Sequence, residues 1–101
     1  MNSVRAEIDT FYGDFAAVLD FDLSEDGKID GHYSFIGYEG TFKGFLTGED
    51  SFEVAGIVDS YVGTIDFTIR GSVDHLSVRG NGVTGRHGTF TIRGVLDKEI
   101  V

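Results

Sequence analysis

Residues 65–73 read IDFTIRGSV and alternate apolar with polar side chains. Ile65, Phe67 and Ile69 fall on one face of an extended chain, with polar residues between them. This two-residue period is typical of a half-buried β-strand, because successive side chains of a strand point to opposite sides of the sheet. The stretch therefore predicts a strand that contributes one face to a core.

The same alternation recurs along the chain and predicts eight strands. They span residues 4–10, 14–23, 28–36, 39–47, 51–59, 63–73, 75–81 and 87–96. The first segment also fits a short helix, since Val4, Ile8 and Phe11 have helical spacing. Short turns favour an antiparallel up-and-down meander, and eight strands can close into a barrel without exposed edges. We expect an all-β, eight-stranded antiparallel barrel, with a two-sheet β-sandwich as the alternative.

An internal repeat of about 25 residues supports this architecture, because two strands with their turns have this length. The pentapeptide FTIRG occurs at residues 67–71 and again at 90–94. Four glycines, spaced 27, 23 and 25 residues apart, mark the repeat: Gly13, Gly40, Gly63 and Gly88. We expect residues 1–101 to form one domain of about four hairpins. The Gly-rich meander resembles lipocalin-like and avidin-like barrels in general shape, without a specific family motif.

Composition and charge exclude several classes of function. The 101 residues include no Cys, which excludes disulfides, thiolate zinc sites and a cysteine nucleophile. The formal charge is −9 and is concentrated in residues 1–50, which hold 3 Lys or Arg against 11 Asp or Glu. This balance argues against nucleic-acid binding, because contacts to phosphates need a basic surface.

The chain shows no sign of a membrane segment or a secretory signal. Its apolar stretches are only a few residues long, and the first residues lack an apolar core region. Together with the absence of Cys, this predicts a cytoplasmic protein that does not bind membranes.

The face predicted to point inward holds few groups that could perform chemistry. Tyr33 is its main polar exception, so no acid–base pair and no buried metal cluster can be assembled there, and no cofactor is expected. The core is either packed or encloses a small apolar cavity. The number of large inward side chains favours packing.

One end of the predicted barrel gathers candidate ligand-binding residues, since alternate turns of a meander lie at the same end. This end is expected to be aromatic and mildly basic, with Tyr12, Tyr38, Tyr61, Arg86 and His87. Tyrosines could form the walls of a binding site while Arg86 or His87 holds an anionic group. In the alternative interpretation the tyrosines plug the barrel and hydrogen-bond to their own turns.

We therefore expect a non-enzymatic protein that binds a small apolar or anionic molecule. The opposite end is expected to be acidic. The acidic N-terminal half supports an alternative: an inhibitor or immunity-type module that recognises a basic protein partner through this half. A small isomerase or cyclase is a second alternative, although no residue selects it.

Two short motifs resemble known sites. Residues 22–30 resemble the start of an EF-hand calcium loop, with candidate ligands Asp22, Ser24, Asp26 and Asp30. The closing Glu is missing, and Asp-Gly between alternating segments favours a hairpin turn. Residues 80–85 match the glycine pattern of a dinucleotide-binding loop, but the strand expected after them excludes that interpretation. We expect this stretch to be a mobile loop.

Apolar residues are also expected on the outer wall of the barrel. Such patches often mark interfaces, which suggests a homodimer through Val18, Ile36, Phe45 and Ile57. Singly exposed apolar residues are the alternative interpretation.

Overall fold

The computed structural model describes residues 1–60 and 63–99 as a closed barrel of eight strands. The strands are β1 (Asn2–Thr10), β2 (Gly13–Leu23), β3 (Lys28–Phe35), β4 (Tyr38–Leu46), β5 (Ser51–Ser60), β6 (Gly63–Asp74), β7 (Ser77–Thr84) and β8 (Gly88–Leu96). Each strand pairs antiparallel with the next, and β8 pairs with β1. The eight-stranded barrel is confirmed. The sandwich alternative is wrong because the ladder closes, and the first segment is a strand rather than a helix.

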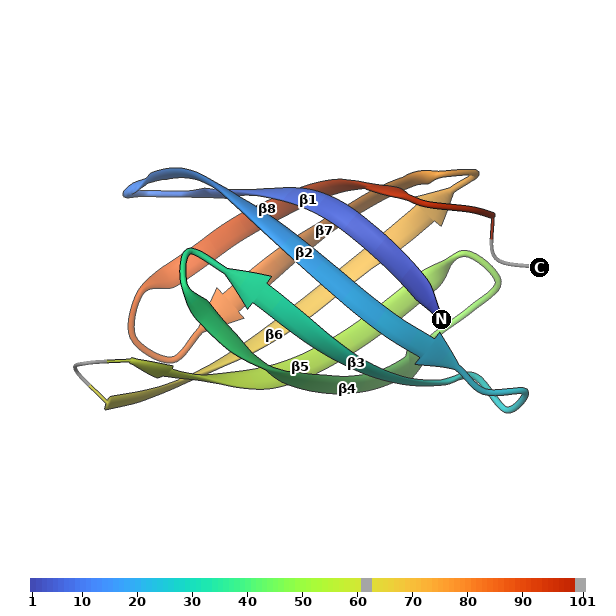
Figure 1. Cartoon of the computed structure of the whole chain (residues 1–101), viewed down its shortest axis with the longest axis horizontal. Helices are drawn as coiled ribbons and strands as arrows, with labels where there is room; N and C mark the ends of the chain where they lie inside the picture. The colour runs from blue at the N-terminus through green and yellow to red at the C-terminus, as the bar shows by residue number, and fades with distance from the viewer. Residues whose placement is uncertain (61–62, 100–101) are drawn as a thin grey trace.

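The barrel has two distinct ends, which Figure 1 shows at the left and right of the view. We call the end where β1, β3, β5 and β7 finish the mouth, and the other end, where β1 begins and β8 finishes, the base. The barrel axis is the long direction of a molecule measuring 39 × 22 × 21 Å. In the described part of the chain no helix is long and apolar enough to cross a membrane.

The inward faces build the core as the alternation predicts. Its buried residues come from all eight strands and are Val4, Ala6, Phe21, Ile29, Tyr33, Phe42, Val54, Ile69, Val78, Ile92 and Leu96. In five cross-strand pairs an aromatic ring lies over the glycine opposite it: Gly31 with Phe42, Gly40 with Tyr33, Gly56 with Phe67, Gly71 with Phe52 and Gly82 with Phe90. Each ring covers the position that a Cβ would take, so these positions require glycine.

Strand β7 differs from its prediction and corrects the loop expected at residues 80–85. It runs from Ser77 to Thr84 rather than over residues 75–81, so most of the glycine-rich stretch is paired strand. Gly82 belongs there because the Phe90 ring lies over it. Leu76, which the strand expected over residues 75–81 included, instead lies in the turn before β7 and is 38% exposed.

The glycines of the repeat are not all equivalent. Gly13, Gly63 and Gly88 each begin the second strand of a hairpin at the mouth, with φ of 128°, 114° and 77°. These angles favour glycine over residues with a Cβ. Gly40 has no such φ and lies inside β4, where it faces Tyr33.

Cross-strand pairing places polar residues beside the apolar residues of the outer wall. Val18 lies opposite Arg5 and Ser34. In the same way, Phe45 lies opposite Lys28 and Glu53. Ile36 is not on the wall, because it lies in the turn between β3 and β4 with a φ of 39°. The wall thus presents apolar residues flanked by polar ones, and the homodimer through Val18, Ile36, Phe45 and Ile57 remains a prediction.

Candidate functional site

An apolar cavity of about 410 Å³ occupies the mouth half of the barrel. Its wall comes from inward residues of several strands: Ile8, Phe15, Ala17, Leu19, Tyr33, Phe35, Val58, Ile65, Phe67, Ile69, Phe90 and Ile92. A second space of about 80 Å³ lies in the base half. Leu19, Ile69 and Ile92 line both spaces and so form the floor of the larger one. The packed interior that the large side chains favoured is therefore wrong for the mouth half.

Among the polar residues described in the cavity lining, Tyr33 is the buried one. Its side chain is buried, its ring meets Phe67 edge to face at 5.8 Å, and its hydroxyl donates a 2.6 Å hydrogen bond to the carbonyl oxygen of Ile57. Burial raises the pKa of the Tyr33 phenol, and the charge of Asp59 adds to this effect. Tyr33 is therefore a neutral phenol whose hydrogen is already bonded.

Three hydroxyl residues, Thr10, Ser60 and Thr84, line the cavity where it opens at the mouth, which we call the rim. Their hydroxyl groups donate hydrogen bonds to backbone carbonyls of the mouth turns. Thr10 Oγ1 donates to the Gly13 carbonyl at 3.0 Å, and Ser60 Oγ to the Gly63 carbonyl at 2.7 Å. Thr84 Oγ1 donates to Gly88 O at 3.1 Å. Thr10 and Thr84 also accept backbone N–H groups, from Tyr12 and His87 respectively. Sequence reasoning missed these hydroxyls, although each stands three or four residues before a glycine of the repeat.

The structure brings together three of the five predicted ligand-binding residues. Tyr12, Tyr38 and His87 line the cavity, and the rings of Tyr12 and His87 meet edge to face at 5.9 Å. Tyr61 lies outside the described residues. Arg86 does not line the cavity, and its Nη1 lies 3.8 Å from the position that a Cβ would take on Gly63.

The mouth is not basic, contrary to expectation. Five carboxylates stand near the mouth ends of their strands: Asp9, Asp14, Glu39, Asp59 and Asp66. These negative charges outnumber the positive charge of Arg86. The carboxylates belong to strands and lie at outward positions, so the turn residues alone do not reveal them. The geometry of the described residues therefore gives no support to the expectation that Arg86 or His87 binds an anionic group of the ligand.

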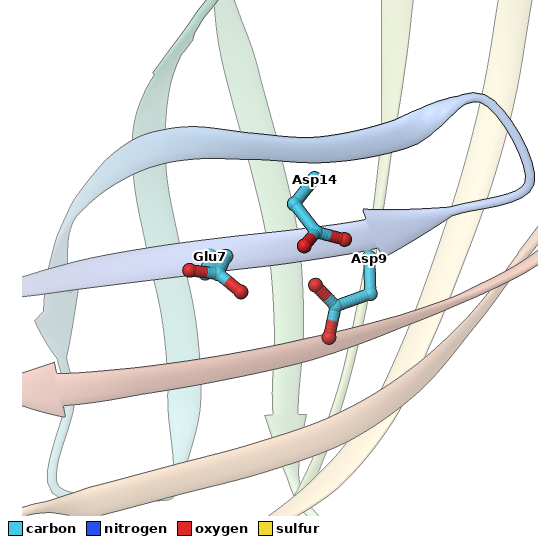
Figure 2. Close-up of side chains that lie close together, drawn as sticks. All are labelled: Glu7, Asp9 and Asp14. Carbon is cyan, nitrogen blue, oxygen red and sulfur yellow. The ribbon is translucent and has the colours of Figure 1, made fainter.

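Three carboxylates converge on the outer wall, where β1 and β2 pair (Figure 2). Oxygen atoms of Glu7, Asp9 and Asp14 lie within 4.8 Å of one another, as in a metal site. However, Arg93 already supplies a cation, with Nη2 2.9 Å from Glu7 and 3.2 Å from Asp9. The cluster is therefore an ion-pair network that ties β8 to β1.

Asp9 and Asp14 are direct cross-strand partners within this network. Asp9 Oδ1 is enclosed and has no hydrogen-bond donor. Protonation of Asp14 supplies one, which raises the pKa of Asp14 and lowers the pKa of Asp9. Asp14 is thus the carboxyl whose negative charge the fold tolerates least.

The calcium candidates belong to a hairpin turn at the base. Asp22 and Asp30 are cross-strand partners, Ser24 accepts the backbone N–H of Lys28 at 2.9 Å, and Ser24 Oγ bonds to the Asp26 carboxylate. The strands on both sides replace the helices of an EF-hand. The structure thus favours the turn over the calcium loop.

Comparison with known proteins identifies the fold. Neither a protein family nor a curated protein matches this sequence. The structure is similar to a redesigned beta barrel, b11L5F_LGL, with a TM-score of 0.79 and 13% identity over 92% of this chain and 87% of that chain. It is also similar to a redesigned beta barrel, mFAP1, bound to DFHBI, with a TM-score of 0.74 and 12% identity over 92% and 90% of the two chains. At these identities the likeness shows that this chain is an eight-stranded antiparallel β-barrel and leaves its function open.

Proposed function

We propose that the protein binds a small, largely apolar molecule in the cavity at the mouth. The observation that carries the proposal is the cavity itself. Its volume of about 410 Å³ lies within the roughly 300–1,000 Å³ of ligand pockets, which are apolar with a few polar groups that orient the ligand. Here those polar groups are Tyr33 and the hydroxyls of the rim.

The similar barrel mFAP1 supports the proposal, because its solved structure holds the small molecule DFHBI. Binding to a basic protein and catalysis by a small barrel enzyme remain alternatives, and no specific contact in the described residues favours either. The cytoplasmic location likewise remains a prediction.

Two matched variants test the proposal with Prodan, a neutral dye whose emission depends on solvent polarity. Val58 lines the cavity, whereas Val73 lines the smaller space in the base half. Val58→Phe fills part of the cavity and should abolish one-to-one binding of the dye, whereas Val73→Phe should preserve it. Circular dichroism confirms that both variants fold. Equal binding by the two folded variants, or none by the native protein, contradicts the proposal.

A further inference from the structure

Four hydroxyls of the cavity wall offer a ligand hydrogen-bond acceptors rather than donors. A hydroxyl has one hydrogen and two lone pairs. The hydrogens of Thr10, Ser60, Thr84 and Tyr33 are all directed at backbone carbonyls. A ligand therefore meets the remaining lone pairs of these four hydroxyls. A hydroxyl can donate to an acceptor on the ligand only if its hydrogen bond to the backbone carbonyl breaks. The carbonyl would then be unsatisfied, which is unfavourable.

Each of the three rim hydroxyls keeps an oxygen that can accept. Thr10 and Thr84 each use one lone pair for a backbone N–H and keep the second, and Ser60 donates its hydrogen to the Gly63 carbonyl, so that its oxygen is also an acceptor. Tyr12, Tyr38, Thr89 and His87 complete the polar rim.

The charges around the mouth favour the same kind of ligand. Asp9, Asp14, Glu39, Asp59 and Asp66 lie near the mouth ends of their strands and outnumber Arg86 of the turn between β7 and β8. Among the described residues, the lining of the opening contains no Lys or Arg. The formal charge of the whole chain is −9. An anionic group would be repelled by this field, whereas a cationic group would be attracted to it.

We propose that the ligand of this cavity is an apolar amine, with its apolar body among the aromatic side chains and its ammonium group at the rim hydroxyls. This inference rests on the proposed function and names its class of ligand. An ammonium group has three hydrogens to donate and no lone pair, so it matches an acceptor-rich rim. Aromatic rings such as Tyr12 also attract cations through their faces.

A series of three compounds with one apolar body tests the inference. Phenylbutylamine, phenylbutanol and phenylbutanoate are cationic, neutral and anionic at neutral pH. Each compound competes with Prodan, and the rise in Tm that it causes is measured in parallel, since a ligand that binds only the folded state raises Tm. If Prodan binds but the Tm series shows another order, only the inference fails, whereas absence of dye binding contradicts the proposed function on which the inference rests.

The amine should displace the dye at a concentration at least about five-fold lower than the carboxylate, with the alcohol between them. A smaller ratio, or any other order, overturns the inference. The advantage of the amine must disappear in Val58→Phe and persist in Val73→Phe. If it persists in both, the amine is adsorbed to the acidic surface and the inference is wrong.

Ser60 provides a matched test of the acceptor rim. Ser60→Ala removes an accepting oxygen at the mouth end of β5, whereas Ser51→Ala makes the same change at the base end of that strand. Ser60→Ala should weaken binding of phenylbutylamine about three-fold or more without changing binding of phenylbutanoate, and Ser60→Thr should restore it. Ser51→Ala should change neither. Equal losses for the amine and the carboxylate in Ser60→Ala would instead indicate a structural role and overturn the inference.

Discussion

The hydroxyl of Tyr33 on β3 donates a 2.6 Å hydrogen bond to the carbonyl oxygen of Ile57 on β5, although β4 lies between these strands. The phenol passes over Gly40, where the position of a Cβ lies 2.5 Å from its oxygen. Toward the mouth, the register between β4 and β5 ends at the pair Phe42 and Gly56. Tyr33 thus joins β3 to β5 where the ladder between β4 and β5 has ended.

Tyr33→Phe should lower the free energy of unfolding by about 1–3 kcal/mol, because it removes this hydrogen bond and leaves the Ile57 carbonyl unsatisfied. Urea unfolding monitored by circular dichroism measures the change. Tyr12→Phe is the control, since Tyr12 is 69% exposed. Similar stabilities of Tyr33→Phe and the native protein would show that the bond contributes nothing.

The stability should also fall at alkaline pH. The pKa of Tyr33 is raised above its ordinary value of 10.0, first by burial and then by Asp59. The folded state therefore holds the phenol proton more tightly than the unfolded chain does. This contribution is complete below the ordinary pKa and is lost as pH rises through the raised one. Urea unfolding across this range should show a decline that is smaller in Tyr33→Phe, and an equal decline in both proteins would refute this assignment.

Gly40→Ala should destabilise the barrel by about 1–3 kcal/mol, because the new methyl group would overlap the Tyr33 ring. The position of a Cβ at Gly40 lies 2.5 Å from the Tyr33 hydroxyl oxygen and 2.8 Å from ring carbons. Gly48→Ala is the control, since its Cβ would meet only the Ser51 hydroxyl, which can rotate away. Thermal unfolding of both variants checks the prediction, which fails if the two lose the same stability.

Asp14→Asn should raise Tm at neutral pH. The amide removes the repulsion between Asp14 and Asp9 and can donate a hydrogen bond to the unsatisfied Asp9 Oδ1. Because the pKa of Asp14 is raised, protonation of Asp14 removes the same repulsion in the native protein as pH falls through this raised pKa. The difference in Tm should therefore shrink in acid. A difference independent of pH would show that repulsion with Asp9 is not its cause.

The strands and their inward faces were predictable because they depend on local alternation. The segment at residues 65–73 is strand in the structure, with Ile69 buried. The turns near Gly13 and Gly88 were likewise predictable, since glycine stands where φ is positive. The prediction failed at Gly82, because a glycine-rich stretch by itself indicates a loop. Here the glycine lies in a strand and makes room for the Phe90 ring of the neighbouring strand.

The candidate site was only partly predictable. The order of the turns placed Tyr12, Tyr38 and His87 at one end, where they line the cavity, whereas Arg86 does not line it. Their role in binding a ligand remains a prediction. The direction of the hydroxyl hydrogens of Thr10 and Ser60 depends on turn geometry that no composition reveals.

By itself, the sequence determined the eight strands, the apolar inner face and the acidic character of the chain, since all three depend on residue type and on spacing along the chain. Only the tertiary structure decided that the mouth half encloses a cavity and that Tyr33 bonds to Ile57. Both depend on which side chains face each other after β8 pairs with β1. That register pairs residues far apart in the chain, so local patterns in the sequence do not predict it.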